Sequence, residues 1–235
     1  MFCKKVYLIF MIFSYLDFHS YIFRKKNISF LFKLPTVKDT WLFNCTEGSQ
    51  FNFLNQSFKI NNLSKIIIPN LHILNISGLF GLLSTLNLTG RIKSLHIYAP
   101  IELRYYLDLG KKYSRTNFSY VLYIHALKTG LIINQYDCRI YALKFFNCYE
   151  FFFVQSERYG TFYLEKAKSD NLMPGPTYGK LKKGSSFLLP DGFILDGSSL
   201  TSSNKLGYQT FCISSLFYSK KFFEAVKKYD LTLFF

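Results

Sequence analysis

The sequence has few acidic residues, few cysteines and no apolar run of membrane-spanning length. Of its 235 residues, 14 are Asp or Glu and 29 are Lys or Arg, which gives a formal net charge of +15. Such an excess of positive charge suits a polyanionic partner, either RNA or an anionic membrane surface. The five cysteines are scattered, odd in number and never spaced C-x-x-C. This pattern argues against a zinc ribbon and a disulfide scaffold, and it indicates a reducing compartment.

An apolar stretch near the start, Val6–Phe13, has two interpretations. It resembles the hydrophobic region of a signal peptide, and it also fits a first buried strand. A spanning helix needs ~20 apolar residues, whereas Asp17, His19 and Arg24 interrupt any extension of this stretch. Because no small-residue cleavage site stands out, we expect a buried strand and no membrane partner.

Apolar and aromatic residues, in contrast, are abundant. They make up 49% and 20% of the chain, with 27 Phe and 18 Tyr, so disorder is excluded and a packed core is expected. Phe, Tyr, Lys, Ile and Asn all have A/T-rich codons. Their excess is typical of an A/T-biased genome such as that of an organelle, and this bias also inflates the number of lysines.

Strand and helix patterns alternate along the chain, which predicts an α/β layered fold. We expect strands at Val6–Phe13, Asn27–Leu34, Thr40–Cys45, Lys65–Ile68, Leu95–Pro100 and Phe211–Ser214, within Tyr120–Val154, and beginning at Asp230–Phe235. We expect helices at Phe51–Lys59, Gly78–Leu86 and Lys220–Tyr229. Of the histidines, His96 lies in an apolar strand and is interpreted as structural, and His125 has no partner by spacing.

Residues 164–190 differ from the rest of the chain. They are rich in lysine, they contain Pro174, Gly175 and Pro176, and a Ser-rich polar loop, Asp196–Asn204, follows them. This composition predicts a protruding basic arm that is not part of the core. A solvated basic hairpin without a partner is the alternative.

Several short motifs, taken in order, resemble those of ribonuclease Z, the tRNA 3′-processing endonuclease of the metallo-β-lactamase superfamily. The matching blocks are W-L-F-N-C-T-E-G-S-Q from Trp41, G-L-F-G-L-L-S-T-L from Gly78 with G-R at Gly90, I-Y-A-P from Ile97, and P-G-P-T-Y-G-K-L-K-K-G from Pro174. The resemblance runs from about Asn27 to Phe235. It implies a metallo-β-lactamase-like αββα sandwich, a single domain over 1–235 that ends before the family's last strands.

The same resemblance implies further properties. Residues 164–190 would be a tRNA-binding arm, with RNA contacts from Pro174, Gly175, Pro176, Lys180, Lys182 and Lys183. The partner would be tRNA or a tRNA precursor, and the chain would form a homodimer or a heterodimer with an active ribonuclease Z. Because plastid-encoded members of the family exist, the expected location is the plastid (chloroplast).

The sequence departs from the family pattern at the positions of the metal ligands. The family's metal-binding loop reads His-x-His-x-Asp-His, and the corresponding residues here are Asn70, His72, Leu74 and Asn75. Further ligand or proton-donor positions correspond to Asn147, Ser215 and Phe234. Zinc needs three or four N, O or S ligands, and only His72 remains from the set. We therefore expect no zinc cofactor, where the family holds two ions, and no catalytic residue. Glu47 is the remaining carboxylate near the site, and it could cap the following helix.

Three functional interpretations stay open. The first is a tRNA-binding ribonuclease Z relative without catalytic activity. The second is an active tRNA-processing nuclease with a reduced or atypical metal site. The third is a decaying reading frame without a selected role. The missing ligands favour the first, which makes the chain more a binding protein than an enzyme.

Overall fold

A computed structural model describes residues 5–8, 11–15, 29–33, 38–55, 58–135, 138–170, 172–188, 192–204, 207, 209–213 and 231–234. The chain forms two compact units. One comprises Met1–Phe153 together with Thr210–Phe235, and the other comprises Val154–Gln209. The expected arm, 164–190, lies within the second unit.

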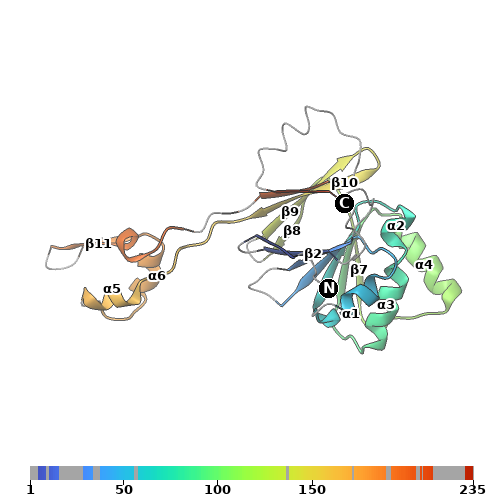
Figure 1. The fold of residues 1–235 in the computed structure, drawn as a ribbon, viewed down its shortest axis with the longest axis horizontal. Helices are drawn as coiled ribbons and strands as arrows, with labels where there is room; N and C mark the ends of the chain where they lie inside the picture. The colour runs from blue at the N-terminus through green and yellow to red at the C-terminus, as the bar shows by residue number, and fades with distance from the viewer. Residues whose placement is uncertain are drawn as a thin grey trace. The chain divides into compact units, whose positions relative to one another are not determined.

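The first unit contains a seven-stranded sheet in which the strands follow their order in the chain (Figure 1). The strands are β1 (Lys5–Leu8), β2 (Met11–Tyr15), β3 (Phe30–Lys33), β4 (Thr40–Phe43), β5 (Leu63–Ile67), β6 (Leu95–Ala99) and β7 (Leu122–Ala126). Pairing is antiparallel from β1 to β4 and parallel from β4 to β7. Parallel strands require crossover segments, which the chain supplies as helices packed on one face.

The prediction of one strand over Val6–Phe13 is wrong. Two strands, β1 and β2, occupy this stretch and pair antiparallel, with Val6 opposite Phe13 and Leu8 opposite Met11. A continuous apolar run carries no turn signal, so hydrophobicity alone does not show that the chain reverses within it.

Helices cover one face of the seven-stranded sheet (Figure 1). They are α1 (Ser49–Asn55), α2 (Ile73–Ile76), α3 (Leu79–Leu88) and α4 (Leu103–Ser114), with a 3-10 turn at η1 (Ile60–Asn62). Buried leucines of α3 and α4 pack against Leu42, Ile66 and Ile97 of the sheet. The sequence patterns predicted α3 but missed α4, whose signal is the pair of buried leucines Leu103 and Leu107 at helical spacing.

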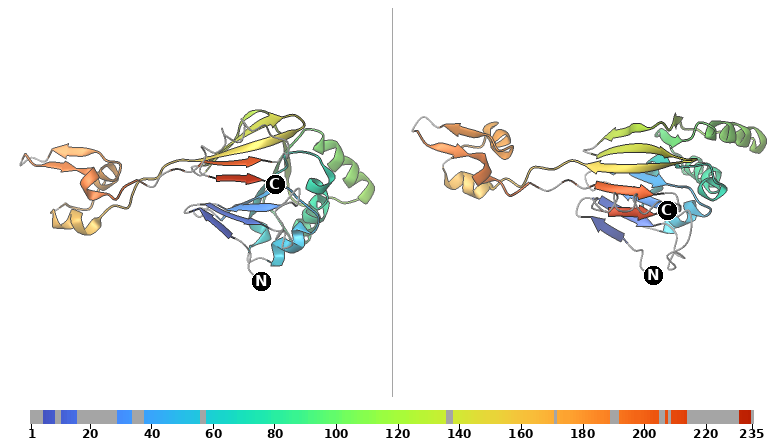
Figure 2. Two further views of the ribbon diagram at one scale, coloured as in Figure 1. Left: turned by 45° about the horizontal axis from the view of Figure 1, so that its top comes forward. Right: turned by 90° about the horizontal axis from the view of Figure 1, so that it is seen from above.

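A second sheet packs against the opposite face of the first. Its order is β14 (Leu231–Phe234), β13 (Gln209–Ile213), β10 (Cys148–Gln155), β9 (Cys138–Phe145) and β8 (Gly130–Gln135). Figure 2 shows these strands side by side. Aromatic rings fill the space between the sheets, with Phe153 at 5.2 Å from both Phe32 and Phe43 between ring centroids. The expected strands at both ends of this sheet are confirmed, and the helix expected at Lys220–Tyr229 lies outside the described residues.

The second unit has a small core of its own. Its elements are α5 (Leu164–Ser169), α6 (Thr177–Lys182), the hairpin of β11 (Ser186–Leu188) and β12 (Ile194–Asp196), and a 3-10 turn, η2 (Gly197–Leu200). The buried residues are Ala167, Leu181, Leu195 and Leu200. A Cβ at Gly197 would lie 2.3 Å from the carbonyl oxygen of Leu181, so only glycine allows η2 to pack against α6. The expectation of a segment without core and of a plain loop at Asp196–Asn204 is therefore corrected.

Candidate functional site

The loop after β5 carries the residues that correspond to the family's metal ligands. Three of them, Asn70, His72 and Leu74, are partly or fully exposed, and Asn75 is only 1% exposed. The backbone anchors the loop on both sides. Tyr149 of β10 donates its N–H to the Pro69 carbonyl at 3.0 Å, and Cys45 donates its N–H to the Asn75 carbonyl at 2.8 Å.

The two asparagines of this loop bind each other. Asn75 donates from Nδ2 to Oδ1 of Asn70 at 2.6 Å. The same oxygen accepts the backbone N–H of His72 at 3.1 Å. Both amides are neutral, so this contact closes the loop without any charge that could offset a dication.

His72, the one residue of the set that keeps the family's ligand type, acts as the N-cap of α2. Its Nδ1 accepts the backbone N–H of Leu74 at 3.4 Å. Leu74, which stands where the family has aspartate, is 48% exposed and offers no lone pair. His72, the predicted relic ligand, thus binds the backbone N–H of Leu74, and the neighbouring Leu74 side chain cannot complete a zinc site.

The remaining family positions are Asn147, Ser215 and Phe234. Asn147 is exposed in the turn between β9 and β10. Ser215 lies outside the described residues, and Phe234 lies in β14, where side chains are not described. Among the described residues, no three His, Cys, Asp or Glu side chains gather closely enough to hold a metal ion. The residues that stand at the described ligand positions therefore do not fit a two-zinc centre, and we derive no metal-dependent step from them.

Two ionisable residues of β10 lie near the loop. Cys148 donates from Sγ to the Phe145 carbonyl at 3.3 Å. Glu150 is buried, and removal of its carboxyl from water raises its pKa from 4.5 to about 7. A carboxyl in this environment is protonated for much of the pH range below neutrality, which makes it a weak metal ligand there.

Two of the matching sequence blocks pack directly on each other. Gly78 donates its N–H to the Cys45 carbonyl at 2.9 Å, and a Cβ at Gly78 would lie 2.0 Å from the Thr46 carbonyl oxygen. Beneath this contact, the buried hydroxyls of Ser29 and Thr46 lie 2.7 Å apart, and the Ser49 hydroxyl donates to the Thr46 carbonyl. Glu47 is exposed. The turn is closed by the three hydroxyls and not by the Glu47 carboxylate. The sequence interpretation missed these hydroxyls.

The predicted RNA-binding residues are all exposed in the second unit. Pro174, Gly175 and Pro176 precede α6, whose buried residue is Leu181. The lysines at 180, 182 and 183 are exposed around this helix. Another lysine of the segment, Lys166, serves the fold instead, since it donates from Nζ to the Ser199 carbonyl at 2.9 Å.

The interpretation of His125 as a residue without a partner is wrong. Its Nε2 lies 2.9 Å from Nδ1 of His96. The two rings also stack, with centroids 5.2 Å apart. The parallel pairing of β6 with β7 brings the histidines together, and this pairing is not visible in the spacing of 29 residues between them.

The chain is similar in sequence to proteins of a red alga and of cyanobacteria, and in fold to a solved structure. No family model matches the chain. The chain is 38% identical over 178 residues to the uncharacterized protein ycf56 of Porphyra purpurea, a match that covers 74% of this chain and 68% of that protein. It is 35% identical over 199 residues to ribonuclease Z of the cyanobacterium Trichodesmium erythraeum, covering 83% and 62%. The structure of the short form of human tRNase Z matches with a TM-score of 0.51 at 22% identity, covering 61% of this chain and 63% of that chain.

The chain has the predicted metallo-β-lactamase-like fold, which it shares with the short form of human tRNase Z. Within that class, the chain belongs to the ribonuclease Z family, which confirms the resemblance of the sequence blocks. It spans about 62% of the length of its cyanobacterial ribonuclease Z relatives. In the part of the chain that the structure describes, no helix is long and apolar enough to cross a membrane.

Proposed function

We propose that this chain binds tRNA or tRNA precursors and does not cleave them. It would act in tRNA 3′-end maturation as a partner or competitor of an active ribonuclease Z. Relatives from a red alga and from cyanobacteria, together with the excess of residue types whose codons are A/T-rich, support a location in the plastid.

One observation above all supports the proposed absence of catalysis. Asn70 and Asn75, which stand at two of the family's ligand positions, hydrogen-bond to each other. Hydrolysis by two metal ions needs cations held close together, because they generate hydroxide and stabilise the leaving oxygen. Two dications repel each other unless anionic ligands lie between them. Leu74 stands where the family places its aspartate, so this loop provides no such ligand.

The exposed lysines of α6 and of its C-cap, Lys183, support RNA binding. Lys180 and Lys183 lie three residues apart and therefore project from neighbouring positions of the helix surface. Lysines bind phosphate as point charges, without base recognition, and release counterions when they do so. Gly175 is exposed, and no atom beyond its chain neighbours lies closer than 3.8 Å to its Cβ position. A phosphate backbone can therefore approach the chain here closely.

An apolar stripe on α4 supports self-association. Ile101 precedes the helix, and Tyr105, Leu109 and Tyr113 follow at intervals of four residues. All four side chains are exposed. Four apolar residues at this spacing form one continuous face, and two copies of such a face can pair antiparallel around a two-fold axis. We propose a second copy of this chain as the occupant.

The purified chain should be tested for zinc content and for cleavage of a tRNA precursor that carries a 3′ trailer. We expect far less than one zinc ion per chain and no trailer removal with zinc, manganese or magnesium. Retained binding of the same precursor would separate an inactive protein from a misfolded one. Trailer removal that is abolished by His72→Ala would instead establish a reduced metal site and contradict the proposal.

A further inference from the structure

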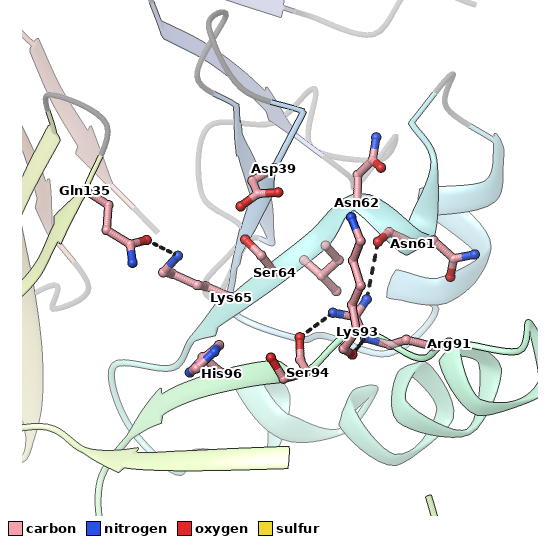
Figure 3. A pocket seen from close by; sticks show the side chains of 11 residues that line it. Asp39, Asn61, Asn62, Ser64, Lys65, Arg91, Lys93, Ser94, His96 and Gln135 are labelled. Atoms are coloured by element: carbon pink, nitrogen blue, oxygen red, sulfur yellow. Dashed lines mark hydrogen bonds between the residues drawn. The ribbon is translucent and has the colours of Figure 1, made fainter. Parts of the chain in front are cut away.

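A cavity of about 390 Å³ lies within the first unit (Figure 3). Its walls come from the start of β5, from the turn before β6 and from Gln135 at the end of β8. The loop with Asn70 follows the carboxyl end of β5, whereas Leu63 and Ser64 of the cavity lie at its amino end. The cavity is thus separate from the family's metal position.

The cavity is lined by an excess of positive charge. Lys65 and Arg91 are 5% and 3% exposed, Lys93 is exposed, and Asp39 is the one carboxylate among the described residues that line the cavity. Burial of a cation is unfavourable unless a charge or hydrogen bond compensates it. Two such buried cations beside one partly buried carboxylate leave a positive field in the cavity.

The two buried cations have different hydrogen-bonding states. Arg91 donates from Nε and Nη2 to the carbonyls of Lys93 and Ser94 at 2.7 and 2.8 Å. Because these donors are already used, Arg91 contributes mainly its positive charge to the cavity. Lys65 donates to Oε1 of Gln135 at 2.6 Å and lies 4.7 Å from the ring centroid of Trp41. An ammonium has three N–H donors, and one bond to an amide does not use them all.

Cross-strand pairing places a histidine next to this lysine. Lys65 of β5 is the direct partner of His96 of β6. Burial, the neighbouring His125 and the positive charge of Lys65 and Arg91 all lower the pKa of His96, so its ring is neutral at pH 7. The neutral ring contributes no charge that would need compensation, and because its Nδ1 is paired with His125, Nε2 is the ring nitrogen left for a ligand.

The remaining lining groups suit a ligand with several acceptor oxygens. The hydroxyls of Ser64 and Ser94 and the amides of Asn61, Asn62 and Gln135 surround the cations. The volume lies within the roughly 300–1,000 Å³ typical of small-molecule sites. We propose that this cavity binds a small phosphate-bearing anion, either inorganic phosphate or a phosphomonoester.

The test is isothermal titration of the full chain at constant low ionic strength, with inorganic phosphate in one arm and adenosine 5′-monophosphate in the other. We expect saturable binding of at least one probe. Equal affinity for both would identify the phosphate group alone as the ligand, and tighter binding of the nucleotide would identify a phosphomonoester. Lys93→Gln, at an exposed position, should weaken binding about fivefold, and Lys65→Met should abolish it.

Lys112→Gln is the matched control, since this exposed lysine of α4 does not line the cavity. Circular dichroism should show that each variant is folded, and if Lys65→Met fails to fold, Lys93→Gln decides the question. Absence of saturable binding for both probes, or equal affinity of Lys93→Gln and the native chain, would overturn the proposal. The arm lysines lie in the other unit, so failure of tRNA binding would leave this result unaffected.

Discussion

Asn75 donates a hydrogen bond from its buried Nδ2 to Oδ1 of Asn70 over 2.6 Å, across the loop that follows β5. In a metal-binding loop of this family the ions would link the ligand positions to one another. Here a neutral amide pair supplies that link, and the Asn70 oxygen also fixes the backbone at His72. The loop therefore has an internal reason to keep its shape without a metal, because the Asn75 amide and the His72 backbone N–H both find their acceptor within it.

Restoring three family ligands should not restore activity. In the variant Asn70→His/Leu74→Asp/Asn75→His, Asn147 and Ser215 still replace further ligands, so the two ions remain incompletely held. We expect no trailer removal from a tRNA precursor, and a loss of stability of about 1–2 kcal/mol from the broken amide bond. Precursor cleavage measures the activity, urea unfolding measures the stability, and metal analysis shows whether the variant holds zinc. Robust cleavage by this variant would show that the other positions are dispensable.

Binding of tRNA should depend on salt through α6. Lys180→Ala/Lys182→Ala/Lys183→Ala should weaken binding and reduce the slope of log Kd against log salt by up to about 0.9 for each phosphate that the variant no longer neutralises. Filter binding or fluorescence anisotropy at several salt concentrations gives this slope. The control Lys112→Ala/Lys128→Ala/Lys144→Ala removes the same charge from exposed positions of the other unit. Equal effects of the two triple variants would indicate general charge attraction and not an arm.

Gly78→Ala should destabilise the first unit strongly. The added Cβ would meet the Thr46 carbonyl oxygen at 2.0 Å, and a backbone group cannot move without disrupting the turn. We expect a loss of about 2–4 kcal/mol in the free energy of unfolding. Gly81→Ala is the matched control on the same helix, because its Cβ meets only the flexible end of Gln50. Its expected effect is within about 1 kcal/mol, since alanine favours the helix. Comparable losses for both would show that the close contact at Gly78 is not the cause.

Stability should fall as pH rises between about 4.5 and 7 because of Glu150. Burial raises its pKa from 4.5 to about 7, so the folded state binds more protons than the unfolded state within this window. The contribution of Glu150 to stability is full at a pH below its pKa in the unfolded chain. It is lost as pH rises through its pKa in the folded chain, a change of at most about 3 kcal/mol. Urea unfolding of native and Glu150→Gln chains from pH 4.5 to 8 measures it. The variant should show a flatter pH profile, and parallel profiles would exclude Glu150 as the source.

Self-association through α4 should be lost on placing charge in its apolar stripe. Tyr105→Lys/Leu109→Lys would bury two ammonium groups in a paired interface, which is strongly unfavourable. Light scattering coupled to gel filtration should give a dimer for the native chain and a monomer for the variant. Leu88→Lys/Ile92→Lys is the control, since both side chains are exposed but do not belong to the stripe. A native monomer at all concentrations would contradict the proposed dimer.

The sequence patterns predicted much of the layered architecture. Short apolar runs such as Leu95–Pro100 became buried parallel strands, and the motif from Gly78 became α3. The patterns failed where tertiary contact decides. Val6–Phe13 divides into two strands that pair with each other, and residues around α6 acquire a core by packing against η2. Neither outcome follows from hydrophobicity along a single segment.

What the sequence alone determined is the chemistry available at each position. Leucine at 74 has no lone pair and asparagine at 70 and 75 has no charge, whatever the fold around them, so the departure from the family's ligands could be identified without coordinates. Which groups meet was decided only by tertiary structure. The bond between the two asparagines, the contact of His96 with His125 and the placement of Lys65 beside Gln135 all depend on loop geometry or strand register. Register joins residues far apart in the chain through backbone pairing, and no local pattern of side chains encodes that pairing.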